Sequence, residues 1–154
     1  MARLEREIAI AAPPERVFAY IAQPERTPEW SPNVVSVRLT SDGPIGVGAT
    51  TETVVKALGT TQTALGRCTA FEPPRRLVIE SRTILGATTT NETVLLADGT
   101  GTRLRAKLDY ALPGGALGGG LLGGFLGIDK QIRKDFEQSL ARLKAIVEAG
   151  RDVR

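Results

Sequence analysis

The residues of this sequence that could do chemistry are few, and they are mainly tyrosine, asparagine and carboxylate side chains. The 154 residues contain no histidine, which removes imidazole as a general base, a metal ligand or a pH switch. The single cysteine, Cys68, can form neither an internal disulfide nor a multi-cysteine metal site. No pair of carboxylates stands out by its spacing as an acid/base pair. We therefore expect no metal and no cofactor, and the residues leave open whether the protein is an enzyme.

The glycine-rich stretch 113–127 holds two patterns that suggest a ligand or a membrane. Its Gly118-x-Gly120-x-x-Gly123 spacing matches a dinucleotide fingerprint, but the one helix that follows has no returning parallel strand. The 19 uncharged residues 110–128 have the length of a membrane span, yet eight glycines and a proline oppose a helix there. We expect an apolar loop over 113–127. Whether it acts as a lid, touches a membrane or partner, or simply packs stays open.

Hydrophobic periodicity predicts the elements that must position any site. Strand-like alternation ends at Pro13-Pro14, a helix runs from there to Pro24, and a very short helix covers Thr27 to Trp30. Turn residues then separate six predicted strands, at 34–39, 50–58, 61–71, 77–85, 88–96 and 102–111. The last strand alternates most clearly, with Leu104, Leu108 and Tyr110 on one face and charged residues on the other. Such a strand has one dry face and one wet face.

A long amphipathic helix is predicted over 128–149. Its apolar stripe includes Ile128, Ile132 and Phe136, while Asp129 and Arg133 stand four apart on the side expected to face water. The dry face of the strands is the only large apolar surface that could cover this stripe. The sequence thus predicts an α+β fold, a curved antiparallel sheet around a long C-terminal helix, in one domain spanning residues 1–154.

A curved sheet wrapped on one helix can leave a cavity between the two layers, and such clefts favour apolar ligands. By alternation the sheet also offers Thr51, Leu77 and Leu104, for which plain core packing is the alternative. Glu52, Arg67 and Glu92 would reach the cavity only if the register shifts by one residue. The residues we expect to bind the ligand are Trp30, Thr53, Val55, Ile79, Ser81, Asn91, Thr93, Leu108, Tyr110, Phe125, Ile132 and Phe136.

Several segments, in order along nearly the whole chain, carry a family resemblance. They are IAIAAPPERVF from Ile8, PEW from Pro28, GVGA from Gly46, FEPPRRL from Phe71, GTGTRL from Gly99 and LARLK from Leu140. With these segments the chain resembles the START-like (SRPBCC) superfamily with the helix-grip (Bet v 1-like) fold, and within it the bacterial polyketide cyclase/dehydrase and lipid-transport group. The resemblance implies the order β-α-α-β6-α and a cavity for an apolar small molecule.

We therefore expect binding or transport of a hydrophobic small molecule, such as a lipid, polyketide or isoprenoid. The alternatives are an enzyme of the polyketide cyclase, aromatase or dehydratase type, and a module that contacts a protein or membrane through the glycine-rich loop. Scattered cations and few aromatic residues argue against a nucleic-acid partner. A transient membrane contact and a homodimer are left open. The lone cysteine indicates a reducing compartment, and we expect the cytoplasm.

Overall fold

The computed structural model describes residues 2–57, 59–84, 86–112 and 122–150. Their order along the chain is the predicted one, with one further 3₁₀ turn between the two short helices. The elements are β1 (Ala2–Ile10), α1 (Pro14–Ile21), η1 (Pro24–Arg26), α2 (Thr27–Trp30), β2 (Val34–Leu39), β3 (Thr50–Ala57), β4 (Thr60–Glu72), β5 (Arg76–Thr83), β6 (Thr88–Asp98), β7 (Gly101–Ala111) and α3 (Leu122–Glu148).

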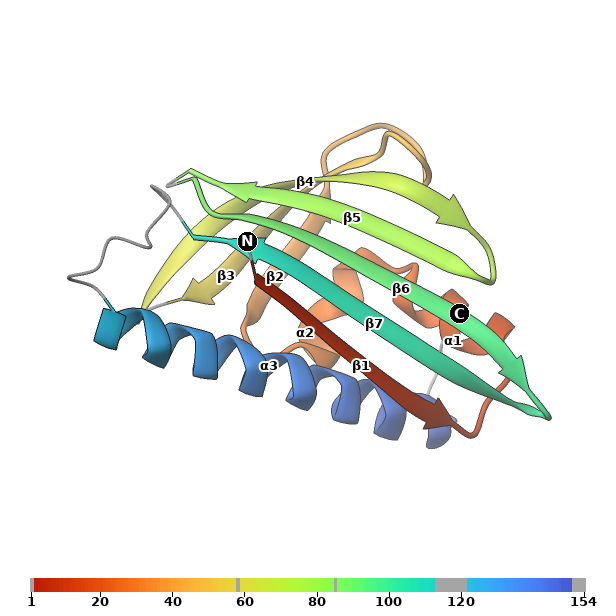
Figure 1. The fold of residues 1–154 in the computed structure, drawn as a ribbon. Helices are drawn as coiled ribbons and strands as arrows, with labels where there is room; N and C mark the ends of the chain where they lie inside the picture. Colours follow the sequence, from red (N-terminus) through yellow and green to blue (C-terminus); the bar gives the residue numbers. More distant parts are fainter. Residues whose placement is uncertain (1, 58, 85, 113–121, 151–154) are drawn as a thin grey trace.

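The strands of the described residues form one curved antiparallel sheet in the order β1-β7-β6-β5-β4-β3-β2. Hairpins connect β2 through β7 in sequence, whereas β1 pairs with β7 at the far side of the sheet. Figure 1 shows α3 lying along one face of this sheet, and α1 and α2 lie on the same side, where both contact α3. We call the face that contacts α3 the inner face and the opposite one the outer face. This arrangement confirms the predicted α+β fold.

The sheet can curve so strongly in part because Gly66, in the middle of β4, has no side chain. A β-carbon built at Gly66 would lie 2.6 Å from Oγ1 of Thr51 and 3.0 Å from Oγ of Ser81. Those two residues sit opposite Gly66 on β3 and β5. Glycine within a strand often marks such a close approach. The inner-face side chains of the two neighbouring strands therefore meet above Gly66.

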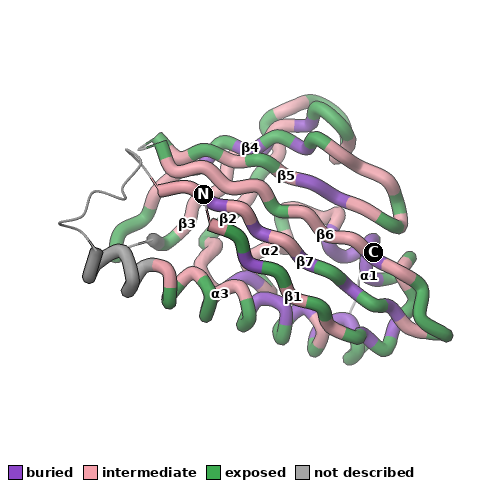
Figure 2. The backbone as a smooth tube through the Cα atoms, viewed as in Figure 1, coloured by how far each residue is buried: buried purple, intermediate pink, exposed green. Residues whose placement is uncertain are grey.

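One half of the space between sheet and helix is a solid core. Leu95 and Leu104 of the sheet are 3% and 0% exposed, and Leu143 and Val147 of α3 are 2% and 0% exposed. Phe18 of α1 joins them and packs edge-on against Phe71, with ring centroids 5.4 Å apart. Among the α3 residues whose burial is described, 129–148, the buried positions lie in the second half of the helix (Figure 2). This half fixes the helix on the sheet.

Polar contacts at the edge of the sheet hold α3 against β1. Glu148 accepts a hydrogen bond of 2.8 Å from the backbone N–H of Ala11 and pairs with Lys144 at 2.7 Å. Eleven residues earlier on the same helix, Glu137 accepts a hydrogen bond of 2.6 Å from the guanidinium of Arg6. The contact between Lys144 and Glu148, four residues apart, has the spacing that supports helices. These bonds fix the rotation of α3 and so decide which side chains it presents to the sheet.

The start of α3 differs from the prediction. The helix begins at Leu122 instead of Ile128, so residues 122–127 are helical and the loop predicted over 113–127 is six residues too long. Each of the three glycines in that segment disfavours a helix by about 1 kcal/mol relative to alanine. Extending an existing helix, however, adds one hydrogen bond per residue without the cost of nucleation. Residues 113–121 of the predicted loop lie outside the described residues.

Candidate functional site

The strand register places the predicted sheet residues on the inner face. Asn91 lies opposite Leu108 on one side and Ile79 on the other, and Thr93 lies opposite Ala106 and Leu77. Residues directly opposite each other in an antiparallel sheet share a face. The same pairing puts Ser81, Thr53, Val55 and Tyr110 on the inner face.

The inner face divides into a filled half and an open half. In the filled half, Leu77 and Leu104 are buried in the core described above, so these two expected cavity residues are core residues. In the open half Asn91 is exposed although it points toward the helix side of the sheet. Five other inner-face residues of β3, β5 and β6 are also partly exposed: Thr53, Val55, Ile79, Ser81 and Thr93. Solvent therefore reaches the inner face over this half, which we call the open half.

The helix supplies the other wall of the open half. Ile132 and Phe136 are partly buried and pack against a small cluster formed by Leu4, Leu108 and Tyr110. Leu108 and Tyr110, both predicted to bind ligand, are 9% and 4% exposed and so belong to this packed wall. The side chain of Phe125, at the start of α3, lies outside the described residues.

Trp30 places an unpartnered hydrogen-bond donor against the main core. The indole packs against the main core from α2, and its Nε1 is buried without a hydrogen-bond partner among the described residues. A buried donor without an acceptor costs about 1–3 kcal/mol. An oxygen of a bound molecule or of a buried water would remove that cost.

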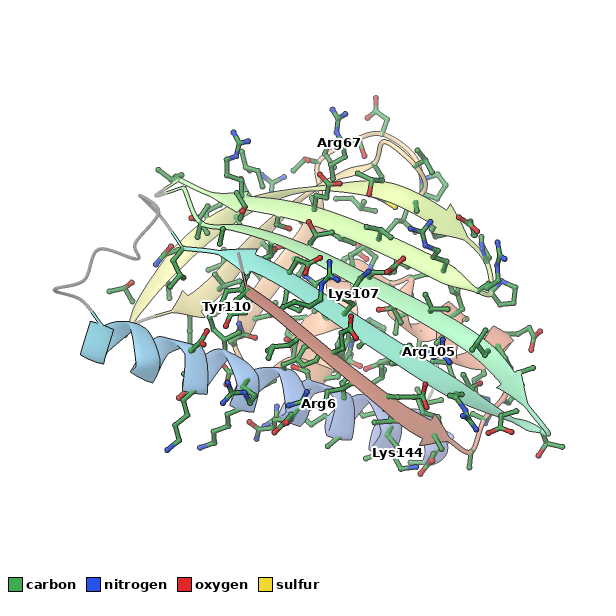
Figure 3. The ribbon with its side chains drawn as sticks, in the orientation of Figure 1. Arg6, Arg67, Arg105, Lys107, Tyr110 and Lys144 are labelled. Atoms are coloured by element: carbon green, nitrogen blue, oxygen red, sulfur yellow. The ribbon has the colours of Figure 1, made fainter. Side chains whose placement is uncertain are left out.

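Tyr110 has a partner that the sequence did not suggest. Its hydroxyl donates a hydrogen bond to the Asp129 carboxylate, from the sheet to the first turns of α3. Figure 3 shows Tyr110 between the sheet and this helix. Asp129 was expected to face water beside Arg133, and that expectation was wrong: the carboxylate turns toward the sheet. The helical spacing indicates this orientation, because Asp129 lies three residues before Ile132 and seven before Phe136, on the same helix face.

The charged strand residues lie on the outer face, as the unshifted register predicts. Glu92 accepts from Arg76 at 2.7 Å and pairs with Lys107 at 3.1 Å. The hydrogen bond from Arg76, assisted by Lys107, holds the pKa of Glu92 below its ordinary value. Arg67 points away from the helix on the outside of the sheet (Figure 3), and Glu52 pairs with Arg38. The open half is thus lined by neutral strand side chains, with Asp129 at its helix wall.

Cys68 sits on the inner face in the filled half. It is 1% exposed, and its thiol donates to the carbonyl of Ala70 at 3.3 Å. Burial raises the pKa of the Cys68 thiol, so the reactive thiolate is disfavoured. The described residues contain no cluster of three acidic or cysteine side chains that could hold a metal ion.

Two surface depressions lie away from these residues. One, of about 350 Å³, is lined by Thr60, Thr61, Gln62, Thr63 and Ile84 at the end of the sheet where β3 turns into β4. The other, of about 260 Å³, lies in the connection between β2 and β3. None of the predicted ligand residues lines either depression. No helix in the described part of the chain combines the length and the apolarity needed to span a bilayer.

Comparisons with solved structures place this geometry among known folds. A protein of Thermus thermophilus superposes with a TM-score of 0.78 at 24% identity, covering 98% of this chain and 100% of that chain. The Zhui aromatase/cyclase of Streptomyces sp. R1128 superposes with a TM-score of 0.76 at 17% identity, covering 96% of this chain and 93% of that chain. Ara h 8.0201 superposes with a TM-score of 0.68 at 16% identity, covering 96% of this chain and 98% of that chain. The predicted helix-grip, Bet v 1-like fold is therefore confirmed.

Sequence comparison identifies the family. No curated protein matches the chain. A family model described as polyketide cyclase / dehydrase and lipid transport, however, matches residues 1–148, nearly the whole chain. The resemblance predicted from the sequence is confirmed, and the chain belongs to the polyketide cyclase/dehydrase and lipid-transport family.

Proposed function

We propose that this protein binds an apolar small molecule, such as a lipid, polyketide or isoprenoid, on the open half of the inner face. The observation that carries the proposal is the exposure of Asn91 and the partial exposure of Ile79 and Thr93 on a face whose other half is filled. Side chains that face a helix and still meet solvent leave room for a ligand between the two layers.

The chemistry of the open half supports a neutral ligand with an apolar body. Ile79, Val55 and Phe136 offer hydrocarbon surface, and the charged residues of β3, β4 and β6 lie on the outer face. Burying an unpaired charge between sheet and helix would cost several kcal/mol, whereas an apolar group gains about 25 cal/mol per Å² removed from water.

Filling the open half tests this proposal. We expect Asn91→Trp to reduce the uptake of a neutral apolar fluorescent probe, such as phenylnaphthylamine, at least tenfold because the indole would occupy the ligand's space. Thr90→Trp is the matched control, since Thr90 is the adjacent residue of β6 and faces outward opposite Asp109. Native mass spectrometry of the purified protein should also detect a co-purifying apolar compound. Equal uptake by both variants would refute the site.

A second function, acid/base catalysis of the cyclase, aromatase or dehydratase type, is favoured by the Tyr110–Asp129 pair. The carboxylate holds the phenol at the wall of the open half, where it could exchange a proton with a bound polyketone. Zhui, one of the similar structures, is described as an aromatase/cyclase. We expect Tyr110→Phe and Asp129→Asn each to lower turnover of a poly-β-ketone analogue by about 10²-fold or more. Turnover that survives both changes would exclude the pair from catalysis.

The remaining expectations rest on the sequence. A contact of the glycine-rich loop with a membrane or partner involves residues 113–121, outside the described residues. Deleting residues 114–120 should abolish such a contact while leaving the fold intact. A homodimer and a cytoplasmic location likewise stay predictions, the latter from the lone Cys68. Sedimentation and cell fractionation would check these two.

A further inference from the structure

The end of the molecule where α3 begins carries several exposed cations and one exposed hydrophobic side chain. The antiparallel register brings the end of β3, the start of β4, the end of β5 and the end of β7 to this same end, and α3 starts there as well (Figure 1). We call the following residues the basic rim: Lys56, Arg82, Ile84, Lys130, Arg133 and Lys134.

The cations of the basic rim are not neutralised by neighbours. All five are exposed, and none takes part in the salt bridges formed within the described part of the chain. Two acids of α3 lie among these cations, and their hydrogen bonds come from neutral groups: Asp129 accepts from Tyr110, and Asp135 accepts from Gln131 at 2.9 Å. Over residues 129–135 the three cations therefore outnumber the carboxylates by one. On the outer face Glu80 lies opposite Arg67.

The charges elsewhere on the sheet contrast with those of the basic rim. Across the outer face, Arg3 pairs with Asp109 at 2.6 Å and Arg105 pairs with Glu7 at 2.7 Å. Glu92 lies between two cations, as described above. The middle of the outer face is therefore largely neutralised. Of the eight exposed cations that form no salt bridge within the described residues, five belong to the rim; the other three are Arg16, Arg67 and Arg142. An anionic partner would meet this end of the molecule first.

Ile84 adds an apolar contact to this charge. It is 86% exposed and directly follows the last residue of β5. Together with Thr60–Thr63 it lines the depression of about 350 Å³. An isoleucine so exposed gains free energy when a partner covers it. Arg82, two residues earlier, would then lie close to the same partner.

We propose that the basic rim docks this protein, end on, against an anionic lipid membrane. The rim cations come from β3, β5 and α3, which lie on both layers of the fold, so a broad flat surface can engage all of them while a compact ligand cannot. Cations near an anionic bilayer contribute additively, and Ile84 would enter the interface. This surface is distinct from the proposed ligand site, although docking there would point the open half toward the lipid.

Vesicle sedimentation tests the proposal. The full chain should bind phosphatidylcholine vesicles that contain one third phosphatidylglycerol far better than pure phosphatidylcholine vesicles, and molar salt should release it. Replacing Lys130, Arg133 and Lys134 with glutamine should weaken binding about a hundredfold, since each cation near such a surface contributes about 1 kcal/mol. The matched control replaces Arg16, Arg67 and Arg142, which are also exposed and outside every described salt bridge. It should weaken binding less than about fivefold.

The apolar contact has its own control. Ile84→Ser should weaken vesicle binding about tenfold, whereas Val47→Ser, at a residue 70% exposed between β2 and β3 and away from the rim, should leave it unchanged. Equal losses from the two triple variants, or binding that ignores lipid charge and salt, would overturn the proposal. Binding to heparin without binding to vesicles would assign the rim to a soluble polyanion instead. Probe uptake in vesicle-free solution should be unchanged in all rim variants, which separates this test from that of the ligand site.

Discussion

A β-carbon at position 66 should destabilise the protein, because Gly66 lies where inner-face side chains of the two neighbouring strands meet. The built Cβ lies 2.6 Å from Thr51 Oγ1, about 0.8 Å inside the 3.4 Å at which ordinary contact begins. It would also lie 3.0 Å from Ser81 Oγ. Ser81 can rotate away, but Thr51 is β-branched and 7% exposed, so its rotamers are restricted.

The size of the effect follows from two opposing contributions. Overpacking a core position costs about 1–3 kcal/mol. Replacing glycine by alanine returns about 0.4–1 kcal/mol by restricting the unfolded chain. We therefore expect Gly66→Ala to lower the free energy of unfolding by about 0.5–2 kcal/mol, and the melting temperature by roughly 2–6 °C for a domain of this length.

Urea unfolding of a double-mutant cycle is the assay. Thr51→Ala removes the atom at 2.6 Å, so Gly66→Ala should cost nearly nothing in that background, with a coupling energy of about 1 kcal/mol. Gly46→Ala is the control, since a β-carbon there meets nothing within 4 Å and should change stability by less than about 0.5 kcal/mol. If Gly66→Ala is neutral, or equally costly with and without Thr51, the convergence of side chains above Gly66 is refuted.

Three further predictions concern single groups. Glu92 has a lowered folded-state pKa, so the stability it contributes is present above its ordinary pKa near 4.5 and is lost as pH falls through the folded value. As the pH is lowered, the free energy of unfolding should therefore fall less steeply for Glu92→Gln than for the unchanged protein. The same pH dependence in both proteins would contradict the pairing of Glu92 with Arg76. Tyr110→Phe should lower the free energy of unfolding by about 1.5 kcal/mol in urea, because a hydrogen bond to a charged acceptor is lost; no change would mean that the bond adds nothing. Cys68 should react with a thiol reagent only at the rate of unfolding, and fast labelling of native protein would show that the thiol is accessible.

Local pattern predicts much of this fold because strand side chains alternate with a period of two. The alternation of Leu104, Leu108 and Tyr110 identified the inner face of β7, and turn residues such as Asp98-Gly99 located the hairpins. Asn91 and Thr93 were correctly placed on that face from alternation alone. The start of α3 was placed too late, because glycine propensity is local whereas helix extension depends on the residues that follow.

The candidate site depended on contacts that no local pattern encodes. Asp129 carries a charge typical of a solvent-facing position, and only the seating of α3 on the sheet turns its carboxylate to Tyr110. The need for Gly66 arises from Thr51 and Ser81, each fifteen residues away along the chain.

The sequence by itself determined the order of the elements, the face of each strand that turns inward and the family to which the chain belongs. Only the tertiary structure decided which half of the inner face is filled, which residues form its wall, and where unpaired cations gather. The physical reason is that a side chain's face is set by its own backbone, whereas its burial and its charge partners are set by segments that are distant in the sequence.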